Sequence, residues 1–228
     1  MRAIYLFISK REKNIFEKYK NNKSLSLFDY LLLFFKGMIA IIESLMRHIS
    51  GPIGFKLREI YYRSIFIKSG KNILIDTGVI IDSPQNIKIG SNVWISSYCT
   101  IAPNLGHLEI GNNIHINSHS HIAGRGEIIF EDNVNISSGA KIFSGAVIIP
   151  TRNKLVWNPM MLEDLSLSNI GSIILRNNST VFANCTVAPG VELGKGSVLM
   201  SNSFLNKNMG EYEIFCGVPA KKIGIRMS

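Results

Sequence analysis

The chain has 228 residues, of which 46% are hydrophobic, and its formal net charge is +9 at pH 7. This length is sufficient for one substantial core, so the chain is not a small stapled scaffold. The three cysteines, Cys99, Cys185 and Cys216, lie far apart and in no CxxC motif. Their number and spacing argue against a disulfide framework and a cysteine zinc site, and favour a reducing compartment.

The positive charge is concentrated at the N-terminal end. Residues 1–70 contain 13 Lys and Arg against 5 Asp and Glu, whereas residues 71–228 contain 12 against 11. No zinc-finger, helix-turn-helix or RNP-type aromatic motif accompanies the basic residues. We therefore expect no nucleic-acid partner.

Residues 25–46 are strongly apolar, but Asp29, Lys36 and Glu43 interrupt them at seven-residue spacing. Such spacing places the three charges near one helical face, which predicts an amphipathic helix and not a membrane span. A second basic segment, "FKLREIYYRSIFIK", follows the Gly51-Pro52 break. Two roles stay open: peripheral contact of residues 25–68 with an anionic membrane, or packing against the main domain or another subunit.

From residue 73 onward, aliphatic or aromatic residues recur every six positions. Ile, Val, Leu or Phe occupies all 17 of these positions: Ile75, Ile81, Ile89, Ile95, Ile101, Ile110, Ile116, Ile122, Phe130, Ile136, Ile142, Leu175, Val181, Val187, Leu193, Leu199 and Leu205. A period of six predicts a short strand followed by a tight turn, with three such units in one triangular coil. The period breaks only after Ile81, Ile101, Ile122 and Ile142, so the extra residues enter at one corner.

These repeats resemble those of the hexapeptide-repeat acyltransferases, specifically the branch that modifies sugars in bacterial surface-polysaccharide synthesis. The resemblance covers about residues 50–226 and also involves "NISSGAKIFSG", "NPMMLED", "TVAPGVELGKGSVL" and "YEIFCGVPAKKIG". It implies a mainly β fold, a left-handed parallel β-helix over residues 71–210 with a long loop at 146–172. Residues 1–70 would form a basic, amphipathic helical segment, and residues 211–228 a C-terminal cap.

The resemblance also implies an activity and an assembly. Members of this family are typically homotrimers that transfer an acetyl group from acetyl-CoA to a carbohydrate acceptor, without a metal, in the groove between adjacent β-helices. By motif position, Ala183 and Ser201 match the turn residues that contact pantetheine. Lys207 and Lys221 match positions from which basic groups reach the CoA phosphates. The expected location is cytoplasmic, at the inner face of the membrane if the N-terminal segment binds lipid.

One departure from the family pattern concerns the catalytic base. Many members carry a catalytic histidine at the start of the long loop, where this chain has Val147. Three of the five histidines instead lie in "NNIHINSHSH", residues 112–121. Strand residues alternate between two faces, so His115 and His121 are expected to point outward from two different flat faces, with His119 in the turn between them.

His119 is therefore the first choice for the catalytic base, with His121 as its partner or replacement, and His115 is expected to be structural. An imidazole there would remove the acceptor proton during attack on the thioester. Four further residues are expected to bind the acceptor: Asn117 in the same turn, Arg125 and Glu127 at the next corner, and Trp157 in the long loop.

Several functional alternatives remain at this point. The main expectation is O-acetylation of a sugar hydroxyl in O-antigen or capsule synthesis. The first alternative is N-acetylation of a nucleotide-linked amino sugar, because a neutral amine is itself nucleophilic and needs less help from a base. More remote alternatives are a γ-carbonic-anhydrase-like zinc site built from the histidines, and a catalytically silent β-helix that serves assembly or membrane binding.

Overall fold

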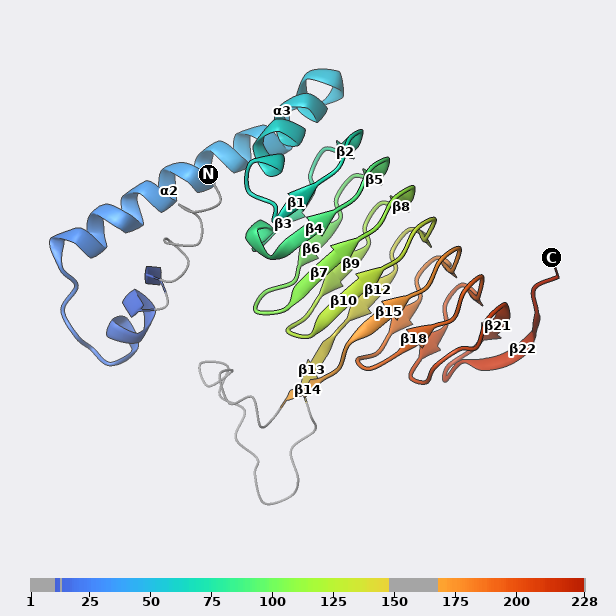
Figure 1. The fold of residues 1–228 in the computed structure, drawn as a ribbon. Helices are drawn as coiled ribbons and strands as arrows, with labels where there is room; N and C mark the ends of the chain where they lie inside the picture. The colour runs from blue at the N-terminus through green and yellow to red at the C-terminus, as the bar shows by residue number, and fades with distance from the viewer. Residues whose placement is uncertain (1–10, 13, 148–167, 228) are drawn as a thin grey trace, which may run out of the picture.

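The structure is a computed structural model that describes residues 11–12, 14–147 and 168–227. Helices α2 (Leu27–His48) and α3 (Gly51–Arg63) precede a parallel β-helix of about six coils. Each coil contributes one strand to each of three sheets, and successive coils stack along one axis (Figure 1). Helix α2 extends away from the first coil, and the C-terminus lies at the opposite end of the β-helix.

The three sheets form the flat sides of the β-helix and are named here in the order in which the chain enters them. Sheet A contains β1 (Lys68–Ser69), β4 (Ile87–Ile89), β7 (His107–Ile110), β10 (Glu127–Phe130), β15 (Ile173–Leu175) and β18 (Glu192–Leu193). Sheet B contains β2 (Ile73–Ile75), β5 (Val93–Ile95), β8 (Ile114–Ile116), β11 (Asn135–Ile136), β16 (Thr180–Val181), β19 (Val198–Leu199), β21 (Glu213–Cys216) and β22 (Lys221–Ile225). Sheet C contains β3 (Ile80–Ile81), β6 (Thr100–Ala102), β9 (His121–Ala123), β12 (Lys141–Phe143), β17 (Thr186–Val187) and β20 (Phe204–Leu205).

The core is a column of aliphatic side chains inside the coils. All 17 residues of the six-residue period are buried, which confirms the predicted register. The coils pair in parallel, so that Ile95, for example, lies between Ile75 and Ile116. Full burial of each such side chain stabilises the fold by roughly 1.5–3 kcal/mol.

The corner between sheets A and B shows how the chain turns within so few residues. Five asparagines at this corner have positive φ angles between 56° and 62°: Asn72, Asn92, Asn113, Asn133 and Asn178. Asparagine tolerates this left-handed conformation better than most residues. The side-chain amides of the first four are hydrogen-bonded in series, at 3.0, 3.0 and 3.1 Å. The turn residues of neighbouring coils therefore support one another.

The corner between sheets C and A accepts the insertions, as the broken period predicted. A short 3-10 turn, Pro84–Asn86, fills the first break. After β12 the chain leaves the coil through β13 (Gly145–Val147) and returns through β14 (Ser168–Ile170), which pair antiparallel. The two ends of the predicted loop 146–172 are thus held together, and residues 148–167 lie outside the described residues.

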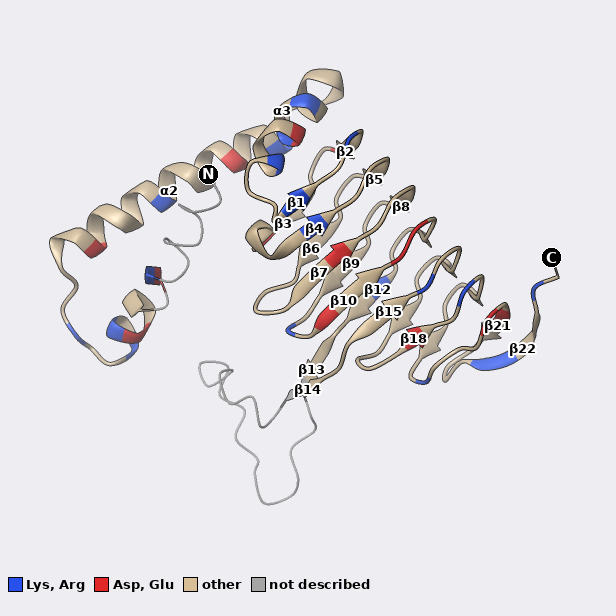
Figure 2. Cartoon of the chain, in the orientation of Figure 1, with Lys and Arg blue, Asp and Glu red and all other residues tan. Residues whose placement is uncertain are grey.

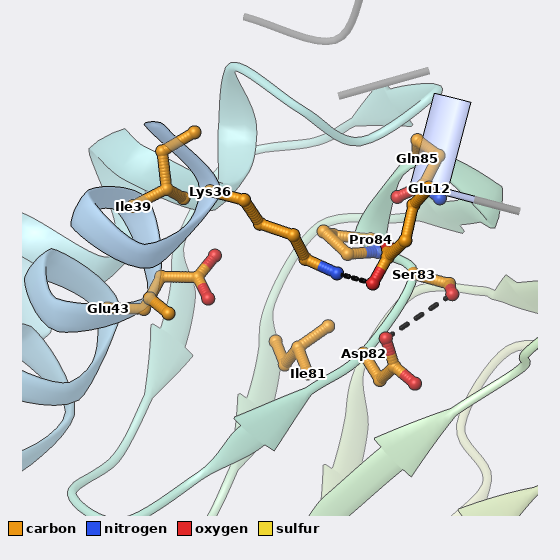
Figure 3. Close-up of a pocket in the computed structure, with 10 residues that line it drawn as sticks. Glu12, Lys36, Ile39, Glu43, Ile81, Asp82, Ser83, Pro84 and Gln85 are labelled. Carbon is orange, nitrogen blue, oxygen red and sulfur yellow. Dashed lines mark hydrogen bonds and ion pairs between the residues drawn. The ribbon is translucent and has the colours of Figure 1, made fainter. Parts of the chain in front are cut away.

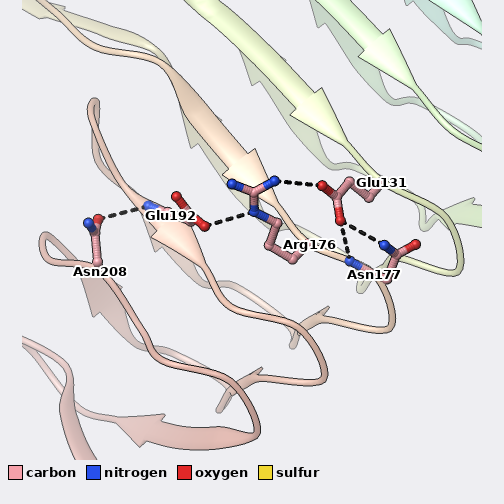
Figure 4. A network of polar contacts seen from close by, with 5 residues as sticks. All are labelled: Glu131, Arg176, Asn177, Glu192 and Asn208. Carbon is pink, nitrogen blue, oxygen red and sulfur yellow. Dashed lines mark hydrogen bonds and ion pairs between the residues drawn. The ribbon is translucent and has the colours of Figure 1, made fainter.

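A network of polar contacts on sheet A joins the coils on either side of this insertion (Figure 4). The Arg176 guanidinium donates to Glu131 Oε1 and to Glu192 Oε1, both at 2.7 Å. The other oxygen of Glu131 accepts from the backbone and side-chain amides of Asn177, at 2.9 and 2.8 Å. Strand β15 is therefore tied to β10 and β18, so that the coil after the long insertion resumes the register of the coil before it.

The ends of the β-helix differ slightly from the boundaries expected at residues 71 and 211. The first strand, β1, already pairs with β4 at Lys68–Ser69. At the other end β21 continues sheet B in parallel with β19, and only the antiparallel β22 acts as a cap. Both outer strands lack the complete six-residue pattern: β1 pairs on one side only, and β21 lies between β19 and the antiparallel β22.

A buried arginine attaches the N-terminal helices to the first coil. Arg58 of α3 donates from Nε to the Ile75 carbonyl oxygen and from Nη1 to the carbonyl oxygens of Met46 and Ile49, each at 2.7 Å. These acceptors lie in β2 and at the end of α2, where helix carbonyls have no partner within the helix. Arg58 therefore joins three elements at one point, and buried Tyr61 and Tyr62 extend the core beneath α3.

Candidate functional site

The corner between sheets B and C, called here the B–C corner, brings together residues that are far apart in the sequence. A small residue comes first in each turn of this corner: Thr77, Ser97, Ser118, Ser138, Ala183 and Ser201. The next residue in each turn has a positive φ angle: Gly78, Tyr98, His119, Gly139, Asn184 and Asn202. From Tyr98 onward, the backbone N–H of each donates to the carbonyl oxygen of the small residue one coil earlier, at 2.9–3.1 Å. The predicted base His119 and the predicted pantetheine contacts Ala183 and Ser201 therefore lie on one continuous corner.

His119 is an exposed side chain with one covered ring face. Its imidazole stacks on Tyr98 of the preceding coil, with ring centroids 5.4 Å apart and an interplanar angle of 9°. In the following coil the corresponding residue is Gly139, which has no side chain. The Tyr98 ring thus orients the imidazole and leaves its other side accessible.

His121 lies on the outer face of sheet C, as the strand alternation predicted. Its register neighbours are Thr100 in β6 and Lys141 in β12. Its ring meets Phe143 edge to face, at a centroid distance of 5.3 Å and an angle of 65°. Within the described residues no hydrogen bond or ring contact joins His121 to His119. The two histidines therefore lie near the same corner, as expected, but their rings do not contact each other. Each ring packs against its own aromatic partner.

His115 points outward from sheet B and is held on three sides. It stacks on Trp94 at 4.6 Å and 13°, and its Nε2 lies 2.8 Å from the Ser96 hydroxyl. The amide nitrogen of Asn117 approaches Nδ1 at 3.4 Å. Partial burial lowers the pKa of the His115 imidazole. These contacts fit the structural role that the sequence suggested for His115.

The lowered pKa of His115 predicts a specific pH dependence of stability. The unfolded chain binds a proton at His115 more readily than the folded chain does, so the free energy of unfolding falls as the pH falls from about 7 to 5. His115→Phe keeps an aromatic ring against Trp94 but cannot take up a proton. We expect the variant to lose less unfolding free energy than the wild type over this range, measured by denaturant unfolding at several pH values. An equal loss in both proteins would contradict this assignment.

The predicted acceptor-binding residues are placed differently from one another. Asn117 is half-buried, and its amide also donates to the Ile136 carbonyl oxygen at 3.1 Å, so it supports the coils and His115. Arg125 is half-buried at the base of the β13–β14 hairpin, and its side chain has no hydrogen bond or ion pair with any described residue. Glu127 is exposed at the start of β10, and Trp157 lies outside the described residues. Of these residues, Arg125 is the most available to an anionic ligand.

The two predicted CoA lysines lie near the C-terminal end of the β-helix. Lys207 is exposed, and its Nζ lies 5.2 Å from the centroid of the Phe215 ring, which it covers at the end of the core. Lys221 is exposed at the start of β22, paired in register with Cys216. Lys221 has no side-chain partner among the described residues, whereas its neighbour Lys222 forms an ion pair with Glu213 at 2.8 Å.

Among the described residues, no group of three or more His, Cys, Asp or Glu side chains is arranged to hold a metal ion. Burial raises the pKa of the Cys99 thiol to about 11, and its Sγ lies 3.0 Å from the Asn117 carbonyl oxygen. This thiol is a poor nucleophile, because the thiolate is the reactive form.

A cavity of about 200 Å³ lies where α2 meets the first coil (Figure 3). Its lining includes Lys36, which is paired with Glu12, together with Glu43, Asp82 and Gln85. None of the predicted site residues lines this cavity. The candidate site therefore lies outside this cavity, on the exposed B–C corner.

The chain is similar to known proteins over much of its length. No protein-family model matches the sequence. A dTDP-4-amino-4,6-dideoxy-D-glucose acyltransferase from Escherichia coli is 26% identical over 171 residues, which cover 75% of this chain and 86% of the relative. WbbJ, a putative lipopolysaccharide biosynthesis O-acetyltransferase from Escherichia coli K12, is 28% identical over 120 residues, 44% of this chain and 61% of WbbJ.

A solved structure also resembles the fold, over 75% of this chain. It is a variant of AntD, an N-acyltransferase from Bacillus cereus, in complex with dTDP and coenzyme A. The match has a TM-score of 0.66 and 26% identity, and covers 75% of this chain and 90% of AntD. The stacked three-strand coils thus define a left-handed parallel β-helix protein.

Within that class, the six-residue repeats and the related enzymes make the chain similar to the hexapeptide-repeat acyltransferases, and acyl transfer is the activity that the relatives share. The resemblance seen in the sequence is thereby confirmed.

Proposed function

We propose that this enzyme transfers an acyl group from acyl-CoA to the amine of a nucleotide-linked amino sugar. The observation that carries the proposal is the match over three quarters of the chain to enzymes of that kind, one of which was solved with dTDP and coenzyme A. This revises the main expectation from the sequence, because these matches favour an amine acceptor over a hydroxyl.

The B–C corner has the dimensions that an extended donor requires. Successive coils are about 4.8 Å apart, so His119 lies about 10 Å from Ala183 and about 14 Å from Ser201 along the corner. We place the pantetheine arm along this row, with its thioester at His119 and its nucleotide end towards Lys207 and Lys221. The small side chains at Ala183 and Ser201 allow the arm to approach the backbone closely.

The chemical step in this arrangement is direct acyl transfer. The neutral amine attacks the thioester carbonyl carbon, so that a C–N bond forms and the C–S bond breaks. His119 accepts the proton that the amine loses, and the departing CoA sulfur takes up a proton to leave as the thiol. We assign His121 and Arg125 to the acceptor, where the positive charge of Arg125 suits the diphosphate of a sugar nucleotide.

The groove for this reaction is proposed to lie between the subunits of a homotrimer. One observation supports a shared site: the described B–C corner is exposed, whereas transfer to an amine requires a site from which competing water is excluded. A neighbouring subunit against sheet B or sheet C would supply the second wall. A trimer in light scattering of the purified protein is the corresponding expectation.

A second candidate function is O-acetylation of a sugar hydroxyl. The similarity to WbbJ supports it, although that match covers less of the chain than the match to the amino-sugar enzyme. The same corner would serve both reactions, because they share the donor and the thioester chemistry.

A panel of acceptors distinguishes the two functions. Labelled acetyl-CoA would be offered with a dTDP-linked 4-amino-4,6-dideoxyglucose, and separately with the matched sugar nucleotide that carries a hydroxyl at the same carbon. We expect acetylation of the amine at least about a hundredfold faster, measured as kcat/KM. Comparable or faster transfer to the hydroxyl would favour O-acetylation, and no turnover with either would contradict the assigned acceptor class.

A further inference from the structure

Helix α2 turns its charged residues towards the rest of the protein. The Asp29 carboxylate is buried, accepts a hydrogen bond from Lys18 Nζ at 2.6 Å, and takes part in a capping box with Ser26. Lys36 is paired with Glu12, and Glu43 accepts a hydrogen bond from the Tyr61 hydroxyl at 2.6 Å. The polar stripe that normally faces water thus faces inward.

The outward face of α2 is correspondingly apolar. Six residues at alternating spacings of four and three are each between 44 and 87% exposed: Leu27, Leu31, Phe34, Met38, Ile41 and Leu45. The exposed Phe28 and Phe35 widen this stripe on one side. Of the charged residues of α2 between 27 and 46, Asp29 is buried and Glu43 is half-buried, while the Lys36 side chain is 41% exposed and paired with Glu12. A continuous exposed apolar surface that runs along a whole helix is typical of a binding face.

The composition of this face favours lipid over a partner helix. A coiled-coil seam is narrow and is flanked by charged side chains that select the partner. Here the flanking positions carry Phe28, Phe35 and Ile42 on one side, and Tyr30 and Ser44 on the other. A wide apolar face rich in Phe, Leu and Ile is typical of a helix that lies in the membrane interface. At 22 residues, α2 is about 33 Å long.

The charge around α2 complements an anionic surface. Residues 1–70 carry 13 Lys and Arg against 5 Asp and Glu. Figure 2 shows basic residues on the segments before and after α2. The exposed ones include Lys20, Lys23, Lys56, Arg63 and Lys68, of which Lys56 and Arg63 share an ion-pair partner, Glu59. Basic residues near an anionic bilayer attract the protein to its surface. Among the described residues, no helix is both long and apolar enough to cross a membrane.

We propose that the outward face of α2 binds the surface of an anionic phospholipid bilayer as a peripheral anchor. The helix lies parallel to the membrane, with Leu31, Phe34 and Ile41 in the acyl-chain boundary and the flanking basic residues at the headgroups. This contact leaves the B–C corner, farther along the β-helix, free for its substrates. The proposal does not depend on the identity of the acceptor.

Vesicle flotation of the full-length purified protein tests the proposal. We expect the wild type to float with vesicles that contain phosphatidylglycerol, and to bind pure phosphatidylcholine vesicles much more weakly. Leu31→Gln/Phe34→Gln/Ile41→Gln removes three exposed apolar side chains and should weaken binding to the anionic vesicles at least about a hundredfold. Added salt should weaken wild-type binding, because it screens the basic residues.

The control replaces an equally exposed apolar residue elsewhere. Ile223→Gln, in β22, should bind vesicles as the wild type does, and helical content from circular dichroism verifies that α2 remains folded in the triple variant. Three results would overturn the proposal: a wild type that does not float, a triple variant that floats equally well, or anionic and neutral vesicles bound alike. A triple variant whose assembly is smaller than that of the wild type, when the wild type does not bind vesicles, would assign the face to contacts between subunits.

Discussion

Replacing His119 with alanine is expected to lower the turnover of an amino-sugar acceptor at about pH 7 by roughly a hundredfold, within the usual contribution of a general base. The physical reason is that an amine must lose a proton to form an amide, and the exposed imidazole stacked on Tyr98 is placed to accept it. Initial rates with saturating acetyl-CoA would measure the effect.

The pH profile separates this role from a merely structural one. At higher pH hydroxide can take up this proton in place of the imidazole, so the deficit of His119→Ala should shrink as the pH rises towards 9. His107→Ala, which alters a histidine of sheet A paired with Glu109, serves as the matched control and should keep wild-type turnover. A deficit that is constant across the profile would contradict proton acceptance by His119. Wild-type turnover in both His119→Ala and His121→Ala would reject the imidazole base altogether.

Replacing Ser201 with phenylalanine is the second change with a large expected effect. The ring would occupy the path proposed for the pantetheine arm, so we expect KM for acetyl-CoA to rise at least about tenfold while the KM for the acceptor changes little. Ser201 is exposed, and the fold should tolerate the larger side chain. Steady-state kinetics with each substrate varied in turn would measure the effect.

The same coil provides the control for this experiment. Lys195 precedes the turn between sheets A and B, as Ser201 precedes the turn of the B–C corner, and Lys195 is also exposed. Lys195→Phe therefore adds an equal ring to an equivalent turn at a different corner, and it should leave the KM for acetyl-CoA unchanged. If both variants raise this KM equally, the donor does not run along the B–C corner.

The fold could be predicted from the sequence because every coil of a β-helix has the same pattern of apolar residues. Each coil needs an apolar residue at the same place in every six, and a change in that pattern would bury a polar side chain, so the register is visible in the sequence. The same register predicted correctly that His115 and His121 face outward from different sheets. The outer strands β1 and β21 were less visible, because neither carries the six-residue pattern of the inner coils.

The surroundings of the histidines were harder to predict, although part of the signal was present. Tyr98 and His119 are 21 residues apart, as are Trp94 and His115, and this distance is one coil plus its insertion. Counting by coils would have placed both aromatic partners beside the histidines. By contrast, Lys36 pairs with Glu12 across a separation of 24 residues outside the repeat, so no periodicity indicated that α2 turns its charges inward.

The placement of every insertion at the corner between sheets C and A has a consequence for how such an enzyme changes over time. Contacts in a solenoid are made between neighbouring coils, and therefore a loop can lengthen at one corner without moving the other two. The contacts among Glu131, Arg176 and Glu192 restore the stacking directly after the longest insertion. Acceptor specificity can therefore diverge through loop length and sequence on one edge, while the edge assigned to the acyl donor keeps its spacing. In the proposed arrangement, acceptor recognition and acyl delivery therefore lie on different edges of the β-helix.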